Sequence, residues 1–404
     1  MPFEIPENWC WTTLGELFDI VSAKRVLQSD WQRTGIPFYR AREIVRLSYE
    51  GYVDNDLFIT EEHYNNLKKS YGVPEPSDIM LSAVGTIGRA YVVRNNDVFY
   101  YKDASVLCLR NVYHLNSEFI KWILSSDLMQ NQMYENSKGT TVDTITIEKA
   151  NSYFLPLPPI DEQYRIVKLL CEWDAYINDI NKNKEEILNN IRTCKSKILD
   201  LAISGKLVPQ DPNDEPAIEL LKRINPNFQP CDNSHYENLP QGWAFCKIKD
   251  IFNITMGQSP TGESINGVKG IEFHQGKIHF TESYLSQSSV YTDQPTKIVE
   301  VDSLLLCVRA PVGVLNITQR KICIGRGLCA LKPKYEIDNL YWLFILSAYK
   351  DYFESNATGS TFKAISGDTI KNAVIKLPPL QEQERILYSI ISLYESLDAI
   401  TAEL

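Results

Sequence analysis

The sequence predicts an α/β (α+β) protein with two tandem globular units, each followed by a long helix. Three observations support this prediction: an internal repeat, a heptad pattern of apolar residues, and short β-type runs separated by turn residues. With 404 residues, the chain is long enough for two domains with separate cores. The predicted divisions are 1–157 and 225–377 for the globular units, and 158–224 and 378–404 for the helical regions.

The internal repeat is clearest in a ten-residue segment, Leu157–Ile166, which returns as Leu377–Ile386. Both copies read Leu-Pro-Pro, two variable residues, Glu-Gln, one variable residue and Arg-Ile. Earlier in each unit, Pro6–Trp9 is echoed by Pro240–Trp243. Because the echoes keep their order while their spacing drifts, they indicate a duplicated domain with length changes in its loops.

The first unit is followed by the pattern of a coiled coil. Apolar residues from Ile166 to Leu201 alternate steps of four and three, which is the spacing of a and d positions, and only Lys184 interrupts them. This spacing predicts a helix over about 161–203, then an extended connector and a short helix over Ala217–Ile224.

The C-terminal region repeats the heptad spacing, so we expect the two long helices to pack side by side. The alternative is two unrelated amphipathic helices, each lying on its own unit. The candidate residues for helix–helix and subunit contact are Ile166, Leu170, Trp173, Ile177, Ile187, Ile191, Ile198, Ile386, Ile390, Leu393 and Leu397.

Both strands and helices are predicted in each globular unit. Apolar runs predict strands at Val106–Leu109, Leu304–Val308 and Ile322–Ile324, bounded by turn residues. One amphipathic helix is predicted in each unit, over Ser117–Met133 and Asp338–Phe353. These elements predict a modest, partly antiparallel sheet in each unit.

Motifs for catalysis and cofactor binding are missing from the sequence. Gly262 and Gly267 have the glycine spacing of a phosphate loop, but Val268 separates that spacing from Lys269. The five histidines lack metal-ligand spacing. We therefore expect no catalysis by the chain itself, no metal site and no cofactor bound to it. Nine singly scattered cysteines and the lack of a membrane-length apolar run predict a cytoplasmic protein.

The charge of the chain is −10, which argues against general polyanion binding, but its basic residues are clustered. Basic residues crowd the stretch 24–46 beside aromatic side chains, and a second cluster between 309 and 334 contains no acidic residue. An arginine fork can bond a guanine edge or a phosphate. Two such clusters in matching units favour nucleic-acid binding over the alternative of a solvated face.

The repeated Leu-Pro-Pro segment, the heptad helix and the runs Lys197–Leu207 and Asp211–Ala217 resemble the specificity subunit of type I restriction–modification enzymes. Gly257–Pro260 and Phe273–Lys277 also resemble segments of that family's target recognition domains. The resemblance implies two target recognition domains joined by an antiparallel coiled coil. Each domain would read one half of a split double-stranded DNA site through the major groove.

The resemblance also implies that the helices set the length of the spacer between the two half-sites and dock two methylation subunits. Restriction (motor) subunits are further implied partners. S-adenosylmethionine, ATP and Mg²⁺ would then be held by those partners. The second helix is not followed by a copy of the Ser204–Leu207 run, which leaves open how the second methylation subunit is held.

Two other functions remain compatible with the sequence: a coiled-coil scaffold without DNA binding, and the specificity part of a combined restriction–methylation enzyme. The candidate DNA-binding residues lie in the basic clusters and in the loops that carry the resemblance. They are Lys24, Arg25, Arg33, Tyr39, Arg40, Arg42, Arg89, Lys138, Thr140, Ser259, Lys277, Arg309, Arg320, Arg326 and Lys363.

Overall fold

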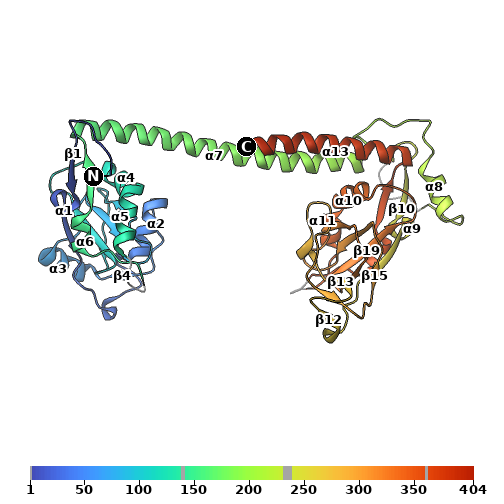
Figure 1. Cartoon of the computed structure of the whole chain (residues 1–404), viewed down its shortest axis with the longest axis horizontal. Coiled ribbons are helices and arrows are strands. Elements are labelled where there is room, and N and C mark those ends of the chain that lie inside the picture. The colour runs from blue at the N-terminus through green and yellow to red at the C-terminus, as the bar shows by residue number, and fades with distance from the viewer. Residues whose placement is uncertain (1, 138–141, 231–238, 360–362) are drawn as a thin grey trace. The chain divides into compact units, whose positions relative to one another are not determined.

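The structure is a computed structural model that describes residues 2–137, 142–230, 239–359 and 363–404. The chain divides into two compact units, Met1–Ile180 and Asn181–Leu404, called unit 1 and unit 2 below. Each unit contains sheets and helices in the predicted α+β arrangement (Figure 1). Within the described ranges, no helix has the length and hydropathy needed to cross a membrane.

Each unit has a two-stranded antiparallel neck that joins the two ends of its globular part. In unit 1, β1 (Cys10–Thr13) pairs with β9 (Phe154–Leu157). In unit 2, β10 (Ala244–Lys247) pairs with β20 (Val374–Leu377) in the corresponding register. The chain therefore enters and leaves each globular part at one place, which is the arrangement expected of a duplicated domain.

The main sheet of each unit has four antiparallel strands. Its strands are β2 (Asp19–Ser22), β8 (Val106–Arg110), β5 (Ile79–Ser82) and β6 (Ala90–Val92) in unit 1, and β11 (Phe252–Met256), β19 (Leu328–Pro333), β16 (Ser303–Cys307) and β17 (Leu315–Thr318) in unit 2. The strand orders, β2-β8-β5-β6 and β11-β19-β16-β17, correspond position by position. This match confirms the duplication, and β8 and β16 confirm two predicted strands to within one residue.

Both faces of the main sheet are buried. On β5, Ile79 and Leu81 pack in one core with Phe119, whereas Met80 packs on the opposite face with Ile44. Successive side chains of a strand point to opposite faces, so a continuous apolar run is what a sheet covered on both sides requires. In unit 2, β16 is buried on both faces in the same way.

Each unit has a second sheet, made of shorter strands. Its strands are β3 (Ile36–Tyr39), β4 (Phe58–Ile59) and β7 (Tyr100–Tyr101) in unit 1, and β12 (Ile265–Asn266), β13 (Ile271–His274), β14 (Tyr291–Thr292), β15 (Ile298–Val299) and β18 (Ile322–Ile324) in unit 2. The parallel pairs β3–β7 and β13–β18 correspond. Between β3 and β5, unit 1 contains α2 (Ala41–Glu50) and α3 (Glu61–Tyr71), whereas unit 2 contains β14 and β15 between β13 and β16. The two copies diverged most in this region.

The helix predicted in each unit is interrupted. It is divided into α4 (Ser117–Leu124) and α5 (Asp127–Ser137) in unit 1, and into α10 (Asn339–Ser347) and α11 (Lys350–Ser355) in unit 2. In unit 1, the Ser125 and Ser126 hydroxyls donate to carbonyl oxygens of the preceding turn. Such bonds compete with helix continuation, which periodicity alone does not predict. The remaining short helices are α1 (Leu14–Leu17), α6 (Ile147–Ser152), α9 (Ile248–Ile251) and α12 (Gly367–Asn372).

The two long helices are present. The first, α7 (Ile160–Ile203), has the predicted bounds to within one residue, and the second, α13, spans Leu380–Glu403. In unit 2 the C-terminal part of α7 lies along α13 (Figure 1). Lys195 Nζ lies 2.6 Å from Asp398 Oδ1, and the Lys184 ammonium donates to the Leu404 carbonyl. From Lys184 to Lys195 the residue number increases along α7, while that of the contacting residue on α13 decreases from Leu404 to Asp398. The two helices are therefore antiparallel. The predicted short helix is α8 (Ala217–Ile224).

The candidate contact residues on these helices differ in burial. Ile386 and Ile390 are fully buried in the core of unit 2, and Ile191 is also buried. By contrast, Trp173 and Ile177 are 60% and 53% exposed. Ile166 and Ile198 are partly buried against the cores of their own units, Leu170 and Leu397 are partly buried, and Ile187 and Leu393 are exposed.

Replacing Ile390 by alanine should lower the free energy of unfolding of unit 2 by about 2–4 kcal/mol, because it leaves a cavity where α13 meets the core. The control is Leu393→Ala on the same helix, where 41% of the residue is exposed and the expected loss is under about 1 kcal/mol. Urea denaturation followed by circular dichroism measures both. Equal losses would show that α13 is not anchored through Ile390.

Candidate nucleic-acid interface

Five loops of unit 2 converge beyond the strand ends, and together they are called the loop cluster below. They comprise residues 257–260, 275–277, 309–311, 325–327 and 363–364. Hydrogen bonds donated by main-chain N–H groups tie them to each other and to the strands. The Ala310 N–H donates to the Lys363 carbonyl over 3.2 Å, and the Arg326 N–H donates to the Ser259 hydroxyl over 3.4 Å. The loop cluster is therefore a supported surface rather than a set of independent loops.

The loop cluster brings together five of the candidate DNA-binding residues: Ser259, Lys277, Arg309, Arg326 and Lys363. The four basic residues are exposed, and none forms an ion pair with another residue of the described ranges. Lys277 and Arg309 line one hollow of about 180 Å³. Unpaired cations held by an ordered backbone can bond phosphates or base edges.

Glycines allow the loops to approach closely, and the sequence analysis did not identify them as part of the site. A Cβ on Gly327 would lie 2.1 Å from the carbonyl oxygen of Gln275. A Cβ on Gly257 would lie 2.1 Å from the carbonyl oxygen of Gly325. Only glycine fits such close backbone contacts. The sequence could have indicated these glycines, because Gly276 precedes Lys277 and Gly325 and Gly327 flank Arg326.

Cys307 lines the same hollow as Lys277 and Arg309. Burial raises the pKa of its thiol to about 11, although nearby Lys277 acts to lower that pKa. The thiol is therefore protonated at neutral pH and lacks the thiolate character of a nucleophile.

Arg320 lies apart from the loop cluster, because it precedes β18 whereas Arg326 follows that strand. Its guanidinium is held by buried Glu272, with Nε–Oε2 2.9 Å and Nη2–Oε1 3.0 Å. Glu272 also accepts from the Ser288 N–H and lies 2.8 Å from His274 Nε2. Burial raises the pKa of Glu272, but these hydrogen bonds outweigh burial and lower its pKa to about 2. The contacts of Arg320 thus support a structural role.

The ion pair between Glu272 and Arg320 makes the stability of unit 2 depend on pH in the acidic range. Because the folded-state pKa is depressed, the pair stabilises unit 2 above the ordinary carboxyl pKa near 4.5 and loses that effect as pH falls toward 2. We expect Arg320→Ala to lower the melting temperature at pH 7 and to flatten its dependence on pH between about 4.5 and 2. Differential scanning calorimetry across that range measures both effects. An unchanged slope would show that Arg320 does not set the Glu272 pKa.

In unit 1, two candidate arginines share one acidic pair. Arg40 Nη2 lies 3.0 Å from Glu43 Oε1 and 2.6 Å from Asp56 Oδ1. Arg42 contacts the same two carboxylates, with Nη2 2.6 Å from Asp56 Oδ2. Burial raises the pKa of Glu43, but its bonds from Arg40 and Arg42 outweigh burial and lower that pKa. The four groups are neutral in sum, so this part of the basic stretch contributes less positive charge than its sequence suggests.

The other candidates of unit 1 lie against aromatic rings or in solvent. Lys24 Nζ lies 5.3 Å from the centre of the Tyr71 ring, and Arg89 Cζ lies 5.2 Å from that of Tyr49. Tyr39 packs against Phe99. Exposed Arg25 and Arg33 form no ion pair within the described ranges, and Lys138 and Thr140 lie outside the described residues.

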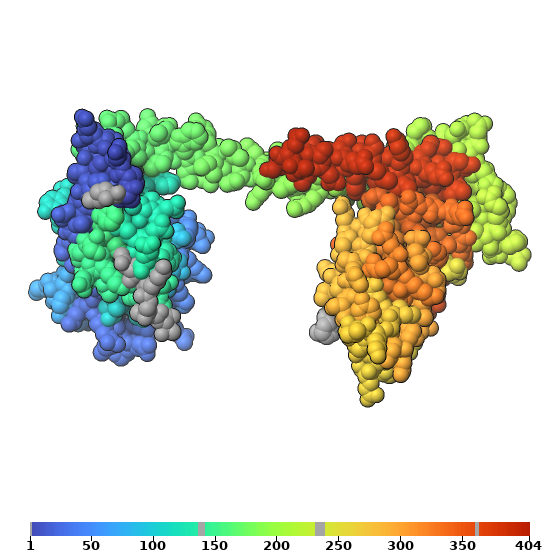
Figure 2. All heavy atoms as spheres, in the orientation of Figure 1, coloured from blue at the N-terminus to red at the C-terminus, as the bar shows by residue number. Residues whose placement is uncertain are grey.

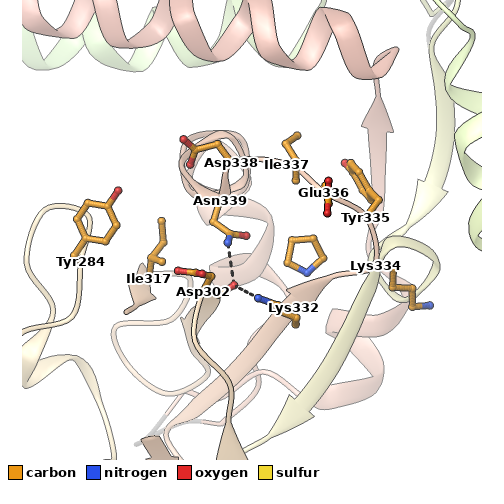
Figure 3. A pocket seen from close by; sticks show the side chains of 11 residues that line it. Tyr284, Asp302, Ile317, Lys332, Lys334, Tyr335, Glu336, Ile337, Asp338 and Asn339 are labelled. Carbon is orange, nitrogen blue, oxygen red and sulfur yellow. Dashed lines mark hydrogen bonds between the residues drawn. The ribbon is translucent and has the colours of Figure 1, made fainter. Parts of the chain in front are cut away.

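A polar hollow of about 560 Å³ lies beside the start of α10 in unit 2 (Figure 3). Its cations already bind backbone carbonyls. Lys332 Nζ donates to the Val301 and Asp302 carbonyls over 2.8 and 3.0 Å, and Lys334 Nζ donates to the Lys249 carbonyl over 2.7 Å. The hollow is therefore a structural junction rather than a phosphate site. Among the described residues, no group of three or more His, Cys, Asp and Glu could hold a metal.

Comparisons with known proteins agree on one family. The model of the type I restriction modification DNA specificity domain matches residues 6–190 and 240–404. The putative type I restriction enzyme MjaX specificity subunit of Methanocaldococcus jannaschii is 28% identical, over 95% of this chain and 86% of its own length. The Escherichia coli EcoEI specificity subunit is 24% identical, over 100% and 80%. The crystal structure of the HsdS subunit from Thermoanaerobacter tengcongensis has a TM-score of 0.64 at 21% identity, covering 100% of this chain and 93% of that one.

Proposed function

The chain belongs to the family of type I restriction–modification DNA specificity subunits, and from this membership we propose how it reads DNA. Unit 1 and unit 2 each read one half of a bipartite double-stranded site. The observation that carries the proposal is the loop cluster of unit 2, which presents four basic side chains that pair with no acidic group among the described residues. They stand on a framework that is duplicated in unit 1.

Readout through the major groove fits the chemistry of this surface. Arginine can bond O6 and N7 of guanine with its fork, and lysine can neutralise a phosphate. The frameworks of the two units correspond strand by strand, while α2 and α3 of unit 1 occupy the place of β14 and β15 in unit 2. A shared framework with different loops supports two domains that recognise different sequences.

The chain's partners are methylation subunits, two of them, and restriction subunits. The exposed apolar side chains of α7, such as Trp173 and Ile177, support docking of a helical partner on that helix. In this proposal the chain is not catalytic. S-adenosylmethionine, ATP and Mg²⁺ bind to the partner subunits, because the sequence contains no phosphate loop or cofactor fingerprint.

A selection from random double-stranded DNA tests the proposal, with the chain alone and with its methylation subunit. We expect one split sequence to be enriched, and methyl transfer only when the methylation subunit is present. A scaffold without DNA binding would enrich no sequence. Methyl transfer or cleavage by the chain alone would refute the non-catalytic assignment.

A further inference from the structure

In unit 2, one segment of the chain covers the junction between the neck and α13. This cover segment, residues 198–214, consists of the end of α7 and the connector that follows it. Figure 2 shows the connector in yellow-green against the end of unit 2 where α13 begins. Ile386 and Ile390 of α13 are fully buried, and Trp243 is 8% exposed. All three belong to one core, against which Leu207 and Val208 of the cover segment pack. The junction in unit 2 is therefore a closed apolar core.

Specific contacts fix the cover segment. Gly205 has φ +67°, and a Cβ there would lie 2.4 Å from Pro240 Cγ. The Gln210 amide donates to Glu382 over 3.2 Å, and the Trp243 indole N–H donates to the same carboxylate over 3.0 Å.

An ion pair completes these contacts. Arg385 binds both carboxylate oxygens of Asp214, over 3.2 and 2.5 Å. Three residues of the cover segment therefore make specific contacts: Gly205 with Pro240, Gln210 with Glu382, and Asp214 with Arg385.

The duplication places the same receiving side chains on unit 1. Pro6 and Trp9 correspond to Pro240 and Trp243, and the repeated segment gives Glu162, Arg165 and Ile166 for Glu382, Arg385 and Ile386. Four residues after this segment, Leu170 takes the place of Ile390. The geometry of the repeated segment is also preserved. The amides of Gln163 and Gln383 donate to the carbonyls of Pro158 and Pro378 over 2.9 and 2.8 Å.

In unit 1 this junction is open. It forms an apolar hollow of about 600 Å³, whose lining includes Phe3, Trp9, Trp122, Ile166 and Leu170. Ile166 and Leu170 are partly exposed, unlike their buried counterparts in unit 2. Within the described residues, the Trp9 indole N–H has no hydrogen-bond partner, and exposed Arg165 has no ion pair.

We propose that the hollow of unit 1 is a docking site for a segment of a partner protein that has the chemistry of the cover segment. That segment is a helix C-terminus capped by glycine, followed by a Leu-Val pair, a glutamine and an aspartate that pairs with Arg165. The glutamine reaches Oε1 of Glu162, because Oε2 already accepts from the Asn8 amide over 3.1 Å. The glycine fits against Pro6 and Trp9, where a side chain would clash. Burial of Ile166 and Leu170 contributes the apolar part of the affinity. The proposal does not depend on DNA binding.

A fluorescein-labelled peptide with the sequence of residues 195–217 tests this site by fluorescence anisotropy on the full chain. We expect saturable binding, weakened at least about tenfold by Arg165→Asp in the protein or by Gly205→Val in the peptide. A peptide carrying Asp214→Arg should bind the Arg165→Asp protein better than the unmodified peptide does, because the swap restores an ion pair. Arg192→Asp, an exposed change of the same charge elsewhere on α7, is the matched control and should leave binding unchanged.

Three results would overturn the proposal. The first is no binding up to millimolar peptide, and the second is binding that Arg165→Asp does not weaken. The third is self-association of the chain in sedimentation experiments that Arg165→Asp abolishes, since a second copy would then occupy the hollow.

Discussion

Replacing Arg309 by alanine is expected to weaken binding to the selected DNA sequence about 10- to 100-fold, which corresponds to about 1–3 kcal/mol. Arg309 is exposed in the loop cluster and forms no ion pair with any described residue, so its removal breaks no salt bridge of the fold. The backbone of its loop is held independently, by the bridge to Ala364 and the bond between Ala310 and Lys363. The loss should therefore appear in DNA affinity and not in stability.

The control for this substitution is Arg223→Ala. It removes the same charge from an exposed site on α8, where the arginine pairs only with Glu215 among the described residues. Surface pairs of this kind contribute little to stability, and we expect no change in DNA affinity. Titrations at several salt concentrations separate two modes of contact. A base contact relaxes specificity at one position, whereas a phosphate contact weakens all sequences alike and reduces the salt slope by about one. If Arg309→Ala bound like Arg223→Ala, the loop cluster would not be the DNA surface.

The sequence predicted best those parts of the fold whose pattern lies within one continuous segment of the chain. Heptad spacing predicted α7 to within one residue, because periodicity reports one helix face directly. The repeat predicted the duplication that the matching strand orders confirm. The division of the predicted helices after Leu124 and Ser347 was not predicted, because it depends on local competition for carbonyl groups.

The candidate site was predicted by charge and only partly by position. Clustering in the sequence grouped Arg309 and Arg326, which both lie in the loop cluster. It could not separate them from Arg320, which lies at the other end of a three-residue strand and is bound by Glu272. Counting charges also missed that Glu43 and Asp56 neutralise Arg40 and Arg42, since Asp56 approaches them only in the folded chain. Pairing across the fold, rather than composition, decides which cations remain available.

Exchanging residues 14–153 for the equivalent part of a relative with a different recognition site should change one half of the recognised sequence completely and leave the other half intact. The structure supplies the exchange points. The chain enters and leaves this part through the neck of unit 1, where the Leu14 N–H donates to the Tyr153 carbonyl over 2.8 Å. The reciprocal exchange uses residues 248–373, where the Ile248 N–H donates to the Ala373 carbonyl over 3.0 Å. Mapping methylated bases across a genome, with the methylation subunit present, measures both exchanges.

Each exchange serves as the experimental control for the other. Both keep β1, β9, β10, β20 and the long helices, so a loss of assembly would remove methylation altogether instead of altering one half-site. The main sheets and most of the cores lie between the necks of each unit, and each unit buries its own sheet on both faces. An exchanged part therefore brings its own core as well as its own loops, and it should fold without adjustment in the other unit. If either exchange altered both half-sites, the units would not read DNA independently, and recognition would have to be assigned to the chain as a whole.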